Sequence, residues 1–394
     1  MRILHVIGNL SRAGGGPSRA VLDMAIALAE RGHEVSIQAT DSGGETLPLQ
    51  PALDAGVEIA RFPVKPPRAW QYSPELARAL ETAIPRAEVV HLHGLYFHHD
   101  LTTGKLCHRT GVPYVLRPYG TLDPWIRRRA RWKKLPMELW FQNRVLREAA
   151  ALHYTAAEEA ERARPFAQGA PEAVVPLGLD PREFATAPEL GAFRAAHPEI
   201  GERRILLFLS RIHEKKGLDL LIPAFARALQ RHDDLQLVIA GPDDGAEGAA
   251  RRLAASHGIA ERVSFPGLLG GEEKLAALAD CALFVLTSYQ ENFGLSVAEA
   301  LAMRRPVLIS DRVNIWRELQ QDGCAFVVPC AVDAIATALS EALSDDARLR
   351  KMGEAGRRCL EGRFHRERMA EGLEALYRSV LEGRRGRSGL AGAP

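Results

Sequence analysis

The sequence predicts an α/β protein with two doubly wound, Rossmann-like domains, each built on a parallel sheet. Short β-branched runs alternate with amphipathic segments along the chain, which is the pattern of right-handed βαβ units. The alternation occurs twice, and 394 residues exceed one ordinary core but suit two domains of roughly 150 to 200 residues each. Ligands bind beyond the carboxyl ends of such strands, so we expect the domains to face each other across a cleft.

The predicted strands are short apolar runs bounded by turn residues. In the first half they are 3–7, 35–39, 57–61, 89–92, 114–116 and 152–154. In the second half they are 205–209, 235–240, 263–265, 283–286, 307–309 and 325–328. Val21, Ala25 and Leu28 share one stripe between the first two strands, and Gly32 follows as a C-cap, so this segment is predicted to be a helix.

The alternating pattern breaks at VVPLGLDPREF and at the proline-containing segments that follow it. We therefore expect an N-terminal domain over 1–185 and a C-terminal domain over 186–363. The end of the chain, from 384 to 394, is small, polar and basic and is predicted to be a disordered tail.

Composition excludes several classes of function. The chain is 46% hydrophobic and 25% charged, as in average soluble proteins, and its net charge of +2 gives no reason to expect a nucleic-acid partner. Five scattered cysteines without C-x-x-C spacing indicate neither disulfides nor a zinc site and suit a reducing cytoplasm. No run approaches the roughly 20 apolar residues of a membrane span. We expect a cytoplasmic protein whose contact with a membrane, if any, is peripheral.

One candidate site lies in ENFGLSVAE, from Glu291 to Glu299, directly after a predicted buried strand. A helix beginning near Phe293 or Gly294 would leave Glu291 in the loop and Glu299 in the first turns. Its N-terminal amides attract anions such as a diphosphate, while the two carboxylates suit sugar or ribose hydroxyls. Two plainer interpretations stay open: Glu291 as a solvated loop residue, and Glu299 as part of a capping box that begins at Ser296.

A diphosphate also needs cations, and SRIHEKKG follows the first strand of the second half. Arg211 offers a bidentate guanidinium and Lys216 a point charge, which suit a leaving group that gains negative charge. Both residues are expected in the same layer as Glu291, at the carboxyl ends of the strands. The alternative is that they are ordinary surface charges.

Taken together, RIHEKKG, IAGP, FPGLLG, the E-x7-E of ENFGLSVAE and a glycine-rich N-terminal loop resemble the family 4 glycosyltransferases, which have the GT-B fold. The resemblance covers nearly the whole chain. It implies that the last helix, about 364–383, returns to the first domain. It also implies a retaining, metal-independent hexosyltransferase that uses a UDP-sugar or GDP-sugar and needs no cofactor.

The resemblance assigns donor-site roles by position. Glu299 would hold the ribose, Glu291 would hold the donor sugar, and Arg211 with Lys216 would neutralise the diphosphate. The backbone at Asn292, Phe293, Gly294 and Leu295 would contact sugar and phosphate. Gly15, Gly16, Gly241 and Gly267 would let loops approach the donor.

The acceptor side departs from the family pattern. Many relatives carry a histidine where PYVLRPYGTLDPW has Tyr119. Tyr119, Arg117 or His93 is expected to take its place, and the sequence leaves the choice open. His98, His99 and Asp100 resemble a metal cluster, but successive residues point in different directions, and a role at the start of a helix is expected instead.

A final motif is WIRRRARWKKLPMELW, where six of the eight residues from Arg127 to Lys134 are basic and Trp125, Trp132 and Trp140 are interleaved. This pattern suits an anionic membrane surface, as a lipid-linked acceptor would require. The alternative is a solvated helix with its tryptophans in the core.

The predicted function is transfer of a sugar from a nucleotide donor to a hydroxyl acceptor in cell-surface polysaccharide or glycolipid synthesis. Two alternatives stay open: a nucleotide-sugar epimerase of the same fold, and a glycosyltransferase-like scaffold without turnover. The donor's base and sugar, the acceptor, the linkage and the oligomeric state cannot be inferred from these motifs.

Overall fold

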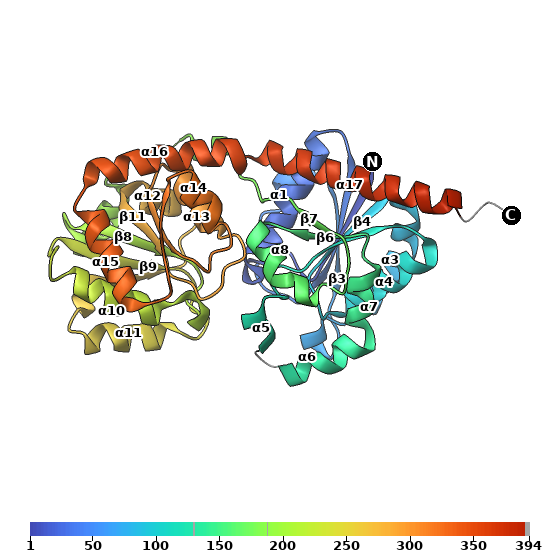
Figure 1. The fold of residues 1–394 in the computed structure, drawn as a ribbon, viewed down its shortest axis with the longest axis horizontal. Helices are drawn as coiled ribbons and strands as arrows, with labels where there is room; N and C mark the ends of the chain where they lie inside the picture. Colours follow the sequence, from blue (N-terminus) through green and yellow to red (C-terminus); the bar gives the residue numbers. More distant parts are fainter. Residues whose placement is uncertain (129–130, 187, 391–394) are drawn as a thin grey trace. The chain divides into compact units, whose positions relative to one another are not determined.

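The computed structural model describes residues 1–128, 131–186 and 188–390, and the chain divides into two compact units (Figure 1). Unit 1 comprises Met1–Gly178 and Arg366–Pro394, and unit 2 comprises Leu179–His365. The boundaries thus fall after Gly178 and His365, whereas the sequence predicted them after 185 and 363. The first boundary divides PLGLDPREF, and the Leu179 amide donates to the carbonyl of Phe364 in the same unit (2.8 Å).

Unit 1 is built on a seven-stranded parallel sheet with the order β3-β2-β1-β4-β5-β6-β7. The order reverses between β1 and β4, and their carboxyl ends form the switch point where ligands bind in such sheets. The strands are β1 (Arg2–Ile7), β2 (Glu34–Asp41), β3 (Glu58–Pro63), β4 (Val89–His93), β5 (Tyr114–Arg117), β6 (Ala151–Tyr154) and β7 (Glu172–Val174). Its helices are α1 (Gly16–Glu30), α2 (Gln50–Asp54), α3 (Pro74–Ala83), α4 (His98–Thr110), α5 (Pro124–Arg128), α6 (Arg131–Met137), α7 (Asn143–Glu148), α8 (Ala157–Ala163) and α17 (Arg366–Leu390).

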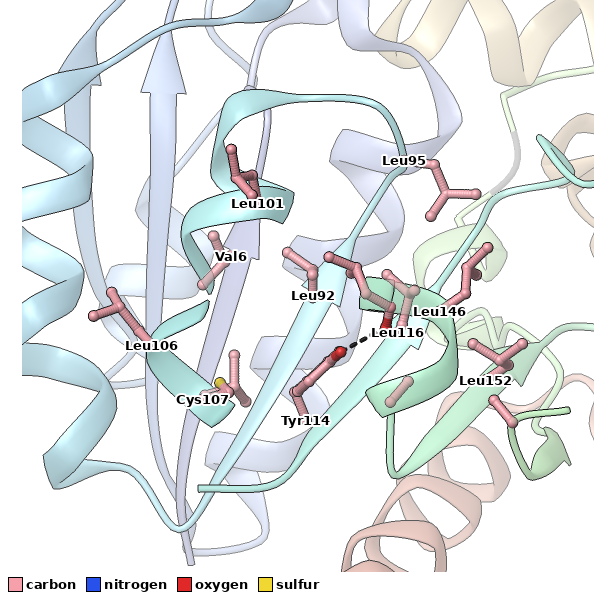
Figure 2. Packing of buried hydrophobic residues seen from close by; sticks show 14 of the residues in the cluster. Val6, Leu92, Leu95, Leu101, Leu106, Cys107, Tyr114, Leu116, Leu146 and Leu152 are labelled. Atoms are coloured by element: carbon pink, nitrogen blue, oxygen red, sulfur yellow. Dashed lines mark hydrogen bonds between the residues drawn. The ribbon is translucent and has the colours of Figure 1, made fainter. Parts of the chain in front are cut away.

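The two faces of this sheet differ in chemistry. One face is apolar and packs against α4 and α7, and the Tyr114 hydroxyl on β5 donates to the Val145 carbonyl on α7 (2.5 Å). Figure 2 shows this packing between the strand residues Val6, Leu92, Leu116 and Leu152 and the helix residues Leu101, Leu106, Cys107 and Leu146. The other face carries His5, His91, His93, Arg117 and His153, all buried, because strand periodicity places alternate residues there.

The last helix, α17, lies along α1 in unit 1 (Figure 1). Tyr377 is fully buried and contacts His91, while Glu374 accepts hydrogen bonds from Arg31 (2.7 Å) and His33 (3.0 Å). The structure continues α17 to Leu390, whereas the sequence predicted a disordered tail from 384. Each residue that extends a helix already held by packing adds a hydrogen bond without a new nucleation step, and this offsets the poor helix propensity of Gly386 and Gly389. Residues 391–394 lie outside the described residues.

Unit 2 has a six-stranded parallel sheet with the order β10-β9-β8-β11-β12-β13, which reverses between β8 and β11. The strands are β8 (Arg204–Leu209), β9 (Leu235–Ala240), β10 (Val263–Gly267), β11 (Cys281–Leu286), β12 (Val307–Ser310) and β13 (Ala325–Val328). Its helices are α9 (Ala192–Ala196), α10 (Leu218–Ala228), α11 (Glu247–Ser256), α12 (Gly271–Asp280), α13 (Leu295–Ala302), α14 (Trp316–Gln321), α15 (Val332–Leu343) and α16 (Asp346–Arg363).

The prediction of two doubly wound parallel sheets is therefore confirmed. All twelve predicted strands are present, with ends shifted by a few residues. The sequence missed β7, a three-residue edge strand whose residues are exposed or half-buried and show no apolar run. Within the described residues no helix is both long and apolar enough to cross a membrane.

Candidate functional site

In unit 2, the loops that follow β8 and β11 meet at the switch point. The Lys216 ammonium forms an ion pair with the Glu291 carboxylate, and the Tyr289 amide donates to the Lys215 carbonyl (2.8 Å). Thr287 also donates its hydroxyl proton to the Gly217 carbonyl (3.0 Å). The structure therefore brings together two motifs that lie 75 residues apart in the chain.

The close approach of these loops depends on Gly217. Its φ is +72°, and a Cβ built there would lie 2.1 Å from the Thr287 carbonyl oxygen. A side chain at this position would therefore push the Lys216 loop away from β11. Gly241 plays a similar part beside β9, where a Cβ would lie 1.9 Å from the Ser210 carbonyl oxygen, and its amide donates to Gly267 (2.7 Å).

Glu291 is held as a charged group. Burial works to raise the pKa of its carboxyl group, but the ammonium groups of Lys216 and Lys215 outweigh burial and lower it. The Glu291 amide donates to the Arg312 carbonyl (3.0 Å), and the Asn314 amide donates to the Glu291 carbonyl (3.1 Å). Glu291 is thus fixed at both backbone and side chain, which disagrees with its interpretation as a solvated loop residue.

The helix α13 begins at Leu295, with Gly294 as its N-cap at φ +78°. Its first internal hydrogen bonds run from Val297 (2.9 Å) and Ala298 (3.2 Å) to the Gly294 carbonyl. The amides of Leu295 and Ser296 precede these bonds, as expected where a helix receives an anion. Because Gly294 is the N-cap, the capping box beginning at Ser296 is wrong.

Phe293 and Asn292 differ in their surroundings. The Phe293 side chain is 2% exposed and packs edge-on against Phe364, with ring centroids 5.3 Å apart. Its side chain therefore belongs to the core of unit 2, and only its backbone faces the loop. Asn292 is partly exposed.

Arg211 and Glu299 have partners that the sequence did not indicate. The Arg211 guanidinium lies 2.6 Å from Asp244, in the loop after β9, and both side chains are about two-fifths exposed. Glu299 lies 2.7 Å from the ammonium of Lys274 on α12. Lys274 is close to Glu299 only because α12 leads into β11 and α13 follows it.

In unit 1, the glycine-rich loop after β1 leads into α1. Gly15 has φ +66° and is the N-cap, Gly16 is the first residue of the helix, and Pro17 follows. The buried Ser18 hydroxyl donates to the Asn9 carbonyl (2.9 Å) and so ties α1 to the end of β1. The expected glycines thus occupy the switch point of unit 1.

The three acceptor-side candidates lie together at the ends of β4 and β5. The Tyr119 hydroxyl is 2.9 Å from His93 Nδ1, and the Arg117 guanidinium stacks on the Tyr119 ring, 4.4 Å from its centroid. His93 and Arg117 are each 1% exposed, whereas Tyr119 is partly exposed. Of the three, only Tyr119 reaches the surface of the unit.

The histidine cluster of His5, His91, His93 and His153 continues this contact into the core. His5 Nδ1 lies 2.9 Å from His93 Nε2, and His153 Nδ1 lies 3.2 Å from His91 Nε2. Burial lowers the pKa of His5 and of His153 to about 3 and holds the pKa of His91 and His93 well below its usual range. All four imidazoles are therefore neutral near pH 7.

His5, His91 and His93 have ring nitrogens within 4.8 Å of one another, a spacing that suits a metal ion. These nitrogens, however, already have partners: His5 Nδ1 bonds to His93 Nε2 (2.9 Å), and His91 Nε2 bonds to His153 Nδ1 (3.2 Å). An ion could bind there only if these buried hydrogen bonds were broken. The neighbouring Arg117 cation disfavours a second positive charge there. These residues do not fit a metal site.

The metal-like trio of His98, His99 and Asp100 has the expected role at the start of α4. The Asp100 carboxylate accepts the Phe97 amide (2.7 Å), closing a cap around the first turn. Burial lowers the pKa of His99 to about 4, and burial raises the pKa of Asp100 to about 8.

The basic stretch from Arg127 to Lys134 differs from the prediction. Arg127 pairs with Glu138 (2.9 Å), and Lys134 donates to the Ile126 carbonyl (2.7 Å), so two of its cations bind within unit 1. Arg128 is exposed; Arg129 lies outside the described residues, as do the side chains of Arg131 and Lys133. Two of the three tryptophans are not in the core, since Trp132 is 75% and Trp140 64% exposed, while Trp125 is half-buried.

The chain matches two family models, one in each unit. Residues 191–359 match the glycosyl transferases group 1, and residues 15–178 match the glycosyl transferase 4-like domain. Among solved structures, Anabaena HepE in complex with UDP and glucose has the same fold, with a TM-score of 0.78 at 16% identity over 96% of this chain and all of that one.

Curated relatives are glycosyltransferases. The alpha-D-kanosaminyltransferase of Streptomyces kanamyceticus is 29% identical over 62% of this chain and 64% of its own length, so the chain spans less than two thirds of that protein. The MMP alpha-(1->4)-mannosyltransferase of Mycolicibacterium hassiacum is 27% identical over 93% of this chain and 95% of its own. The GDP-mannose:cellobiosyl-diphosphopolyprenol alpha-mannosyltransferase of Xanthomonas campestris is 24% identical over 88% of this chain and 90% of its own length. The chain therefore belongs to the family 4 glycosyltransferases of the GT-B fold.

Proposed function

We propose that the protein transfers a hexosyl group from a nucleoside diphosphate sugar to a hydroxyl group of a saccharide or lipid-linked acceptor. The observation that carries this proposal is the Lys216–Glu291 ion pair beside the N-terminus of α13, at the switch point of unit 2. The mannosyltransferase relatives favour transfer over the epimerase and the scaffold. The name of the Xanthomonas campestris relative makes GDP-mannose the first donor to test, ahead of UDP-sugars.

In this proposal the unit 2 site recognises the donor in three parts. Glu299 accepts hydrogen bonds from the ribose hydroxyls, and Glu291 accepts them from the sugar. Lys216, Arg211 and the first amides of α13 bind the diphosphate. For Arg211 this requires its exposed pairing with Asp244 to open, which costs little because exposed pairs contribute only about 0 to 1 kcal/mol.

These cations suit a leaving group that gains charge in the transition state. The bond between the anomeric carbon and the diphosphate oxygen breaks, the acceptor oxygen bonds to the anomeric carbon, and the acceptor proton leaves with the diphosphate. Lys216 and Arg211 offset the developing negative charge, so we propose transfer without a metal ion. Retention of configuration is part of the proposal on the strength of the family alone, and no nucleophile is assigned.

We also propose that the enzyme binds the cytoplasmic face of a membrane through an apolar patch, defined as Trp132, Leu135, Leu139 and Trp140. These side chains are 43–75% exposed in α6 and the turn after it. Trp140 packs on Trp70, with ring centroids 5.7 Å apart, which holds its ring at the surface. Exposed tryptophan and leucine beside basic residues suit the headgroup boundary of a bilayer, where a lipid-linked acceptor resides.

The proposal is tested by the thermal unfolding of the wild type and of Glu299→Ala with UDP, GDP, ADP and their sugar conjugates. A ligand at a hundredfold over its dissociation constant stabilises the folded state by about 2.7 kcal/mol. We expect a shift with one nucleotide family, lost in Glu299→Ala, followed by transfer from the matching sugar conjugate. No shift with any nucleotide would exclude the donor site.

A further inference from the structure

Tyr119 is held in one orientation by its backbone. Its φ is +52°, in the left-handed region that non-glycine residues rarely occupy, and such strain gathers at ligand sites. The next residue, Gly120, donates its amide to the buried carboxylate of Glu159 (3.0 Å). Glu159 also accepts the amide (2.8 Å) and hydroxyl (2.9 Å) of Thr155, so the strained turn is tied to the start of α8.

The side chain of Tyr119 is fixed just as closely. Arg117 lies against the ring face, and His93 Nδ1 lies 2.9 Å from the hydroxyl oxygen. The second neighbour of this oxygen is the Pro17 carbonyl at 3.4 Å, a long contact to the first turn of α1, next to Gly15 and Gly16. The hydroxyl therefore has one good hydrogen bond, to His93, and one poor one.

The direction of the proton in that good bond follows from His5. His5 Nδ1 bonds to His93 Nε2, and His5 Nε2 is buried without a partner among the described residues. If His93 donated to His5, then His5 Nε2 would carry a buried N–H with no acceptor, and buried orphan N–H groups are rarer than orphan acceptors. The favoured arrangement of protons is therefore that His5 Nδ1–H donates to His93 Nε2 and that His93 Nδ1–H donates to the Tyr119 hydroxyl oxygen.

In this order the Tyr119 oxygen accepts from His93, and its own proton points away from the core. Burial raises the pKa of Tyr119 to about 12, which the Arg117 cation only partly offsets, so the group stays protonated at neutral pH. It is then a hydrogen-bond donor and not a base. The nearest acceptor for its proton, the Pro17 carbonyl, is distant enough for a ligand oxygen to replace it.

We infer that Tyr119 donates its hydroxyl proton to an oxygen of the sugar-bearing ligand at the switch point of unit 1, and that His93 and His5 are positioning residues that set the direction of this proton. This inference rests on the proposed transfer of a hexosyl group. It resolves the choice among the three acceptor-side candidates: Tyr119 touches the ligand, while the buried His93 and Arg117 act through it.

The test is a double-mutant cycle on transfer, with Tyr119→Phe, His93→Leu and the double variant. Each single variant should lower kcat/KM for the acceptor about 3- to 10-fold, the range of one neutral hydrogen bond, with nucleotide binding unchanged. If His93 acts through Tyr119, the loss of kcat/KM in the double variant should be no larger than the loss in Tyr119→Phe alone. His93→Asn, which keeps a donor near the Nδ1 position, should recover most of the rate.

Tyr377→Phe is the matched control, because the Tyr377 hydroxyl bonds to His91 in the same cluster (2.7 Å) but does not reach Tyr119. It should leave kcat/KM unchanged. Losses that multiply in the double variant, or an unaffected Tyr119→Phe, would overturn the inference.

A second measurement separates this inference from the proposed function. Nitrogen-15 NMR of labelled histidine identifies which ring nitrogen carries the proton in the unliganded protein. We expect Nδ1–H on both His5 and His93. Nε2–H on His93 would refute the relay even in an active enzyme, whereas an inactive wild type with the expected tautomers would refute only the transfer.

Discussion

The Lys274 ammonium lies 2.7 Å from the Glu299 carboxylate, so the residue proposed to hold the ribose already has a cationic partner. The two side chains are 26% and 20% exposed, and pairs that water reaches are worth about 0.2 to 1 kcal/mol. Lys274→Met should therefore weaken nucleotide binding by less than about fivefold. Glu299→Ala removes hydrogen bonds to a charged group and should weaken it at least tenfold.

Isothermal titration with the nucleotide identified by thermal unfolding distinguishes these effects. If Lys274→Met proved as damaging as Glu299→Ala, Lys274 would have to contact the nucleotide itself and not merely orient the carboxylate.

The Lys216–Glu291 pair is more buried, with side chains 6% and 16% exposed, and should behave differently. Lys216→Met removes the ion-pair partner of the Glu291 carboxylate and leaves only the Lys215 ammonium and the Arg211 guanidinium to offset its charge, so it should lower the free energy of unfolding by up to about 3 kcal/mol. The double variant with Glu291→Gln removes both charges and should recover much of that loss while transfer stays absent. Urea unfolding and a transfer assay check the two parts. A double variant less stable than Lys216→Met would mean that the pair's charges are not coupled.

The position of this pair was predictable in outline, because the loops after β8 and β11 flank the point where the strand order reverses. The apolar runs of both strands and the turn residues after them are local signals. Lys274 was not predictable, since it depends on how α12 packs beside α13. Similarly, His5 and His91 meet through the register of β1 with β4, which the sequence does not contain.

Acid should destabilise unit 1 through its buried histidines. Their pKa values are lowered in the folded state, so the unfolded chain binds more protons below pH 6.5, and the free energy of unfolding falls as pH decreases. Each such group contributes about 1.4 kcal/mol per pH unit. The groups are His5, His91, His93, His99 and His153. The Arg117 cation also lowers the pKa of His91, His93 and His153, while Tyr377 bonds to His91 and Tyr119 to His93.

Two buried carboxyls, Asp100 and Glu159, have raised pKa values and oppose this effect. The net slope between pH 6.5 and 5 should then keep its sign but lie below that of five histidines, about 7 kcal/mol per pH unit. Urea midpoints at several pH values measure this slope. His153→Asn should reduce it by the contribution of one histidine, about 1.4 kcal/mol per pH unit. A flat profile would contradict the buried, neutral cluster.

The apolar patch should govern attachment to vesicles. Leu139 is 74% exposed, and transferring such a side chain from water to an apolar boundary is worth about 1.5 to 3 kcal/mol. Leu139→Ser should therefore lower vesicle affinity about tenfold or more, on neutral and anionic lipid alike. Arg128→Gln should matter only on anionic lipid.

Leu190→Ser is the matched control, because Leu190 is 78% exposed but belongs to unit 2. Co-sedimentation compares the three variants. Equal losses from both leucine variants would mean that attachment is unspecific.

The contact between the loops of the donor site depends on the absence of a side chain at Gly217. In Gly217→Ala, the new Cβ would meet the Thr287 carbonyl at 2.1 Å, and the backbone would also resist φ +72°. The Lys216 loop must then move away from β11, which separates Lys216 from Glu291. We expect a loss of stability above about 1 kcal/mol and loss of nucleotide binding.

Gly258→Ala separates the two causes, since Gly258 has φ +69° but nothing within 4 Å of its Cβ position. It should cost only the strain of the left-handed backbone, about 1 kcal/mol, and leave nucleotide binding intact. The difference in unfolding free energy between the two variants measures the steric term at Thr287. If Gly217→Ala bound nucleotide as well as Gly258→Ala does, the close approach of the loops would not be needed to form the donor site.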